Sequence, residues 1–138
     1  MKKFMKKLIF TGITAVFFLT GCAQSQLPEQ FDEETVKEEA MKAVELFNKR
    51  DYQSILDMGV DELKKSLTAE QFAQVSDPYR DKCGDFQEIE KTVTVGSENK
   101  QTGKQFGGVV MIGKYADGKI QFTIAFDENM KLAQFYIQ

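Results

Sequence analysis

The apolar positions along the chain change their period near residue 84. Before that point they recur every three or four residues, and after it they alternate with polar residues. From residue 33 onward, one stripe at i, i+4, i+7, i+8 and i+11 predicts an amphipathic helix that ends near residue 48. Its buried face is expected to carry Val36, Ala40, Ala43, Val44 and Phe47. Asp32 is the predicted N-cap, because its carboxylate can accept hydrogen bonds from free N–H groups of the first turn.

Shorter helical segments follow up to Gly84. Asp51 is predicted to cap a short helix, and residues 60–67 to form a further turn. Thr68 begins a third helix with the spacing of a capping box, and its inward side chains are expected to be Phe72, Val75 and Tyr79. Because a proline inside a helix removes a hydrogen bond and clashes with the preceding turn, we expect a kink or a break at Pro78.

The alternation after Gly84 predicts a sheet of about four strands. They are expected near residues 88–95, 106–115, 120–126 and 132–137. The second strand is apolar in both phases and is therefore expected to be central, and Asp117-Gly118 predicts a hairpin. Strands joined by hairpins are antiparallel, and the helices are needed to cover their apolar face. The order of elements thus predicts an α+β domain over residues 32–138, with N-terminal helices packed on a curved antiparallel sheet.

The first 21 residues have the pattern of a signal peptide. A basic start with Lys2, Lys3, Lys6 and Lys7 precedes a mostly apolar run over residues 8–19. About 20 apolar residues are needed to span a bilayer, so this run is too short for a stable transmembrane helix. The four lysines also divide the charge of the chain. Fourteen basic residues stand against 21 acidic ones after Cys22, and a net charge of −7 disfavours nucleic acid as a partner.

Leu19-Thr20-Gly21-Cys22 resembles the lipobox of bacterial lipoproteins. The resemblance implies that the signal peptidase recognises Leu19, Thr20 and Gly21, and that Cys22 becomes the first residue and carries acyl chains, diacylglyceryl and palmitate. One acyl chain binds a membrane marginally, whereas two or three anchor a protein stably. Residues 22–31 are then the acylated cysteine and a polar linker. The protein is expected at the cell membrane, on the extracytoplasmic face, with a Gram-positive cell surface favoured.

Candidate chemistry in the rest of the chain is sparse. Histidine is absent, which removes the commonest general base and the commonest metal ligand. With Cys22 acylated, Cys83 has no disulfide partner and is expected to be a buried structural thiol. Residues 103–108 lack the Gly-Lys-Ser/Thr pattern of a phosphate loop, and residues 127–129 lack the spacing of a calcium loop. We therefore predict no catalytic residue, no cofactor and no metal site.

A family resemblance rests on these segments: Phe47-Asn48-Lys49-Arg50-Asp51-Tyr52, Asp61-Glu62-Leu63-Lys64, Leu67-Thr68-Ala69-Glu70-Gln71, Gly84-Asp85-Phe86, Phe126-Asp127-Glu128 and Lys131-Leu132-Ala133. Over about residues 33–138 the chain resembles the bacterial family of unknown function catalogued as domain 3887. The resemblance implies the nuclear-transport-factor-like superfamily, in which a curved sheet wraps a long helix into a cone. Superfamily enzymes use the cone interior as a pocket, with Asp, Tyr and often His as acid or base.

Three functions stay open at this point. The first is non-catalytic binding of a small apolar molecule or an envelope protein, with a pocket lined by Tyr52, Phe72, Phe122 and Ile124. The second is a lyase, isomerase or hydrolase that uses an Asp or Tyr of the pocket. The third is a homodimer or assembly module that uses its open sheet face. A buried carboxylate in a pocket would favour the enzyme, and a filled interior with an exposed apolar sheet face would favour the assembly module.

Overall fold

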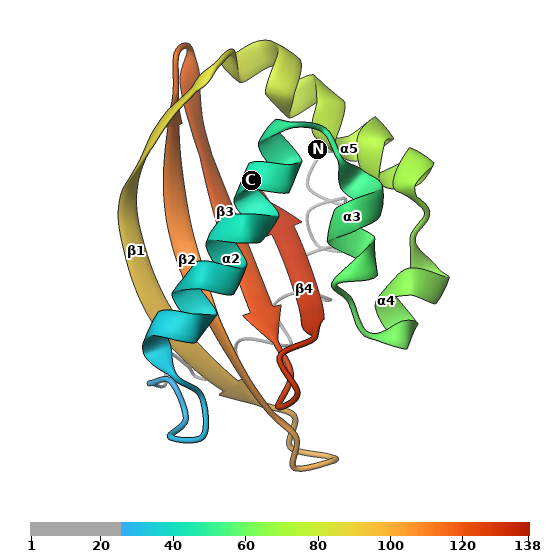
Figure 1. Ribbon diagram of the computed structural model, residues 1–138, viewed down its shortest axis with the longest axis vertical. Helices are drawn as coiled ribbons and strands as arrows, with labels where there is room; N and C mark the ends of the chain where they lie inside the picture. The colour runs from blue at the N-terminus through green and yellow to red at the C-terminus, as the bar shows by residue number, and fades with distance from the viewer. Residues whose placement is uncertain (1–25) are drawn as a thin grey trace, which may run out of the picture.

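The computed structural model describes residues 26–138, so the predicted signal peptide and Cys22 lie outside the described residues. The helices in this range are α2 (Glu33–Asn48), α3 (Tyr52–Asp57), α4 (Asp61–Ser66) and α5 (Ala69–Cys83). The strands that follow are β1 (Phe86–Glu98), β2 (Gln105–Tyr115), β3 (Gly118–Phe126) and β4 (Leu132–Ile137). Helices followed by a curved four-stranded sheet confirm the predicted α+β class (Figure 1).

The strands form one antiparallel sheet in the order β1-β2-β3-β4. The helices pack on one face of it, which we call the inner face, and the other is the outer face (Figure 1). The predicted central position of β2 is confirmed, and Tyr115 pairs with Gly118 across the tight turn of the predicted hairpin. β1 extends to Glu98, beyond the predicted end, because Gly96 and Ser97 still pair with β2. The connecting loop is therefore residues 99–104.

The helix α2 is the main inner-face element. All five positions of its predicted stripe are buried, and it packs against β1, β2 and β3. The predicted N-cap is confirmed, since Asp32 accepts hydrogen bonds from the Thr35 backbone N–H at 3.0 Å and hydroxyl at 2.8 Å. These bonds favour the charged carboxylate and lower the pKa of Asp32. Near the other end of α2, the Phe47 ring meets Phe122 edge-on, with centroids 5.2 Å apart.

The helix α5 departs from the sequence prediction in two ways. The capping box of Thr68 and Gln71 is confirmed, but a break at Pro78 is wrong, because the helix runs uninterrupted from 69 to 83. Both Pro78 and Gln74, whose carbonyl loses its helical partner, are exposed, so water can satisfy that oxygen.

The inward face of α5 also differs from the prediction. Val75 is 60% exposed, whereas the neighbouring Ser76 is only 1% exposed. Phe72, Ser76 and Cys83 lie at i, i+4 and i+11, and these share one helix face. The buried stripe therefore includes a serine. Prediction by hydrophobicity alone selects the neighbouring valine instead, one residue too early.

The segment 27–31, counted in the polar linker by the sequence, packs against the inner face of the sheet. Phe31 is only 7% exposed, Leu27 packs against the core, and Phe31 N–H donates to the Pro28 carbonyl at 3.0 Å. Gly96 and Gly107 form a cross-strand pair below this segment. A Cβ at Gly107 would lie 2.7 Å from the Phe31 ring, and one at Gly96 would lie 2.7 Å from Pro28. The two glycines thus form the seat of the 27–31 segment.

Candidate functional site

The four side chains that the sequence places around a pocket lie in the core. Phe122 and Ile124 of β3 are fully buried, and Tyr52 and Phe72 are nearly so. The rings of Tyr52 and Phe72 stack with centroids 5.0 Å apart, and Phe135 of β4 fills the space beside Phe72 at 5.5 Å. These side chains pack against one another, and none of them lines the cavity described below.

A polar network surrounds the hydroxyl of Tyr52 at the ends of α2 and α5. Tyr52 donates to the Asp77 carboxylate at 2.7 Å, and Arg50 lies 3.3 Å from Asp77 and 2.8 Å from Asp81. Burial and the hydrogen bond to Asp77 both raise the pKa of Tyr52. The phenol therefore stays protonated and acts as a donor that ties α3 to α5. Sequence analysis considered Tyr52 but did not pair it with Asp77.

A second network closes the same end of the molecule. The hydroxyl of Tyr115 donates to the Asn48 side chain, and Arg80 lies over the Tyr115 ring, 5.2 Å from its centroid. Arg80 also donates to the carbonyl of Gly84 at 2.9 Å, which fixes the end of α5. Cys83 is buried beside this network, as predicted. The Tyr115 hydroxyl and the Arg80 guanidinium thereby join α2, α5 and β2, although the Arg80 Nε is buried and has no hydrogen-bond partner among the described residues.

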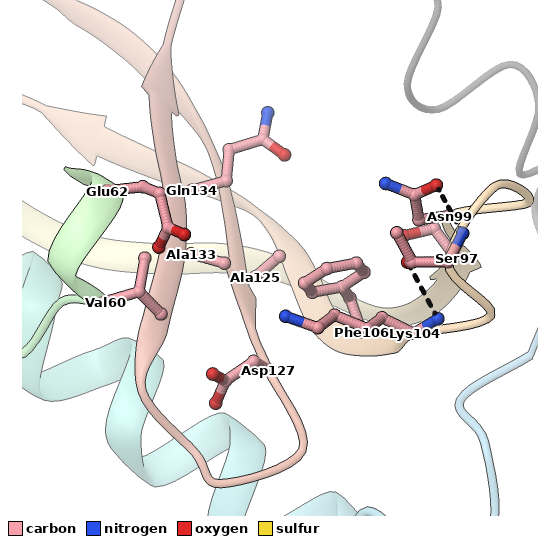
Figure 2. Close-up of a pocket in the computed structure, with 11 residues that line it drawn as sticks. Val60, Glu62, Ser97, Asn99, Lys104, Phe106, Ala125, Asp127, Ala133 and Gln134 are labelled. Atoms are coloured by element: carbon pink, nitrogen blue, oxygen red, sulfur yellow. Dashed lines mark hydrogen bonds between the residues drawn. The ribbon is translucent and has the colours of Figure 1, made fainter. Parts of the chain in front are cut away.

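The described residues also form a cavity of about 250 Å³ on the outer face of the sheet (Figure 2). Val60 and Glu62 of the α4 region bound it on one side, and Ser97 and Asn99 bound it on the other, with Phe106 and Ala125 between them (Figure 2). The complete lining is Val60, Glu62, Ser97, Asn99, Thr102, Lys104, Phe106, Ala125, Asp127, Ala133 and Gln134. Its walls therefore come from all four strands or their loops and from α4.

Strand register explains why these residues meet. Ala125 pairs with Gly108 on one side and with Gln134 on the other, so all three stand on the outer face. Gly108 leaves no side chain on β2 opposite Ala125, and a Cβ there would come within 2.2 Å of the Ile124 carbonyl oxygen. Val60 reaches the site because its N–H donates to the Leu132 carbonyl at 2.9 Å, next to the parallel bridge between Gly59 and Leu132. That bridge attaches the α4 region to the free edge of β4.

The polar groups of the cavity are held by local hydrogen bonds. Asn99 accepts from the Gln101 backbone N–H at 2.9 Å, and Thr102 accepts from that of Lys104 at 3.2 Å, which shapes the 99–104 loop. Asp127 accepts from two N–H groups of its own turn, both at 2.9 Å. The loop and the turn thereby hold their side chains at the rim of the cavity.

Three other polar groups of the cavity have no hydrogen-bond or ion-pair partner among residues 26–138. The Oε1 of Gln134 is buried and has no hydrogen-bond partner among the described residues. Lys104 and Glu62 take part in no ion pair of residues 26–138, and the Lys104 side chain points from its loop toward the side of Glu62 (Figure 2). A buried acceptor without a partner costs about 1–3 kcal/mol, and this cost falls on a residue of the cavity lining.

The cavity was not predicted from the sequence. Its residues lie between positions 60 and 134, and only the fold brings them together. The sequence of β3 shows polar residues alternating with apolar ones, but this pattern is equally typical of a solvated sheet face and of a binding face. Among residues 26–138 no group of His, Cys, Asp and Glu side chains could hold a metal ion. In the same range no helix is long and apolar enough to cross a membrane.

Comparison with known proteins places the chain in a family. Residues 40–135 match the family described as "Protein of unknown function (DUF3887)". No curated protein matches the chain significantly. A solved structure, "NMR structure of protein from Ruminococcus gnavus ATCC 29149", is 34% identical, covers 82% of this chain and 96% of that chain, and has a TM-score of 0.71. With the family match over most of its length and this shared fold, the chain belongs to the DUF3887 family of proteins of unknown function.

Proposed function

We propose that the protein is an extracytoplasmic lipoprotein, held at the membrane by acyl chains on Cys22, whose domain binds a small ligand in the outer-face cavity. The lipobox after a basic start and a short apolar run supports the anchor. The observation that carries ligand binding is the 250 Å³ cavity with the unpartnered Gln134 Oε1 in its wall. A concave site with a few convergent polar groups is the usual form of a small-molecule site.

The lining indicates the chemistry of the ligand. Val60, Phe106 and Ala125 offer apolar contact, while Gln134 Oε1 requires a hydrogen-bond donor. Lys104 and Glu62 stand on different sides of the cavity and can each meet an opposite charge on the ligand. The cavity volume lies just below the usual range of about 300–1,000 Å³ for ligand pockets. We therefore propose a small amphiphilic molecule with a donor group, and not a large cofactor.

The anchor and the ligand are tested first on native material. Protein purified from its membrane in mild detergent is examined by native mass spectrometry, which shows acyl chains on Cys22 and any co-purifying molecule in one spectrum. The Cys22→Ser variant is expected to lose the acyl mass and the membrane fraction. A mature protein that begins at Met1, or an unmodified Cys22, would overturn the lipoprotein proposal.

The cavity is tested by filling it. Ala125→Leu places three additional carbon atoms in the cavity and is expected to weaken binding of the co-purified molecule at least tenfold in an NMR titration. Thr123→Val is the matched control, because Thr123 stands on the same face of β3 and does not line the cavity. Equal affinity of the wild type and Ala125→Leu, with both folded, would refute the cavity as the binding site.

A second candidate, a homodimer through the outer face, has one observation in its favour. Val93 is 43% exposed and Tyr136 is 37% exposed, and by strand register both lie on this face. Sedimentation of the wild type and of Val93→Lys at the same concentration tests it. A monomer in both cases would refute the dimer and leave ligand binding untouched.

A further inference from the structure

We infer that the end of the sheet that carries the 99–104 loop and the 127–131 turn faces the membrane, so that the cavity opens close to the bilayer surface. The inference rests on the lipid anchor of the proposed function and adds the orientation of the domain to it. It comes from the packing of residues 27–31, which the sequence analysis had counted in the polar linker.

The chain is fixed to the domain at the Gly96–Gly107 pair. Phe31 is buried, and Leu27 and Phe31 both lie against Gly107. At Gly96 the carbonyl oxygen of Gln26 comes within 2.4 Å of where a Cβ would stand. Because two separate contacts hold the segment, its attachment to the sheet begins at Gln26 and not at Asp32. The segment thus joins the sheet where β1 ends and β2 begins.

The remaining tether is short. From Cys22 to Gln26 there are only four steps along the chain, which reach about 14 Å when fully extended. From Gly107, the level at which Gln26 is held, β2 continues to Tyr115 for about 26 Å at roughly 3.3 Å per residue. An inverted domain would need Gln26 to stand about that far above the bilayer. The tether is only about half as long as required, so the turn at 116–117 cannot be the membrane-facing end.

The cavity lies at the tethered end of the sheet. Ser97, the next residue after Gly96, lines it from the outer face, while Gln26 rests on Gly96 from the inner face. The 99–104 loop and the turn at 127–131 are at this same end (Figure 1). With Cys22 in the bilayer, the cavity is therefore within about 20 Å of the membrane surface. A molecule at the membrane interface can reach it directly.

Paramagnetic relaxation in nanodiscs tests the orientation. The full acylated protein is reconstituted with lipids that carry a gadolinium chelate on the headgroup, and the broadening of backbone amide signals is measured. We expect the signals of Gly103 and Asn129 to broaden at least tenfold more than those of Gly84 and Asp117. Two controls bracket this result. Thr123→Val, on the outer face and outside the cavity lining, should keep the difference, and a 20-residue Gly/Ser insertion before Gln26 should reduce it, because such a linker adds about 25 Å of reach.

The outcomes separate the orientation from the anchor. Equal broadening at both ends, or more at Asp117, overturns the inferred orientation even if Cys22 carries lipid. If native Cys22 carries no lipid, the anchor proposal fails, and the processed chain coupled through Cys22 to a maleimide lipid still tests the orientation. Cys83 is buried and does not compete for that coupling. Persistence of the difference with the long insertion would refute the tether as its cause.

Discussion

Gly107→Ala is the substitution that most sharply tests the seat of residues 27–31. Gly107 pairs with Gly96 on β1 and with Phe126 on β3, and its φ is not in the left-handed region, so the backbone accepts alanine. A glycine within a strand is less stable than alanine by about 0.5–1 kcal/mol. Conformational entropy alone therefore predicts that Gly107→Ala stabilises the protein.

The packing predicts the opposite sign. The new Cβ would lie 2.7 Å from the Phe31 ring and 2.8 Å from Leu27, distances that require Phe31 to move. Full burial of a phenylalanine contributes about 1.5–3 kcal/mol. Loss of most of that burial outweighs the gain in backbone entropy. We expect Gly107→Ala to lower the free energy of unfolding by about 1–2 kcal/mol.

A double-mutant cycle in urea isolates the cause. Unfolding is followed by far-ultraviolet circular dichroism for the wild type, Gly107→Ala, Phe31→Ala and the double variant. If the effect of Gly107→Ala arises from its clash with Phe31, the same substitution in the Phe31→Ala background should leave the free energy of unfolding unchanged or raise it. The coupling energy between the two substitutions should then exceed about 1 kcal/mol. Additive effects of the two substitutions would refute the seat, and with it the shortened tether on which the orientation rests.

Three further predictions concern other contacts. Tyr52→Phe removes the hydrogen bond to Asp77 but keeps the ring stack. It should lower the free energy of unfolding, measured in urea, by only about 1 kcal/mol, because water can hydrogen-bond to Asp77 in place of the lost hydroxyl. Tyr79→Phe is the control. Burial raises the pKa of Tyr115 from 10.0 to about 12. The contribution of Tyr115 to the free energy of unfolding is therefore complete below pH 10 and is lost as the pH rises toward 12. In thermal melts, Tyr115→Phe should make the alkaline decline in melting temperature less steep. Thr68→Ala should lower the free energy of unfolding in urea by about 1 kcal/mol, because the capping box is lost, and Ser66→Ala should lower it by less.

Local patterns were sufficient for much of the fold. The stripe on α2, the Asp32 cap and the capping box at Thr68 depend on residues within a turn or two of one another. The same holds for β3, whose alternation and preceding turn place it correctly. These features could be predicted because their energetics are set by near neighbours in the sequence.

The features that escaped prediction depend on distant contacts. Phe31 immediately precedes the N-cap of α2, which is the position of a hydrophobic staple. That signal could have predicted that Phe31 belongs to the folded domain. Its actual partner, Gly107, lies 76 residues away and is recognisable only once β1 and β2 are paired. Ser76 is buried because α5 is rotated by its packing on α3 and β3, which the sequence of α5 alone does not determine. The cavity residues are equally dispersed.

The adjacent glycines 107 and 108 lie between the 27–31 segment and the strand that carries Ala125 of the cavity. Successive residues of a strand point to opposite faces, so two glycines in a row remove a side chain from both faces at the same place. On the inner face, Gly107 admits Phe31. On the outer face, Gly108 allows the β3 backbone to approach closely, because a Cβ there would lie 2.2 Å from the Ile124 carbonyl oxygen and 2.9 Å from the Cα of Ala125, which lines the cavity. A substitution at 107 should therefore displace the 27–31 segment, and one at 108 should displace the β3 backbone next to Ala125 in the cavity wall. Gln26 rests on Gly96 from the inner face and Ser97 lines the cavity from the outer face, so the 27–31 segment and the cavity lie on opposite faces at the same level of the sheet.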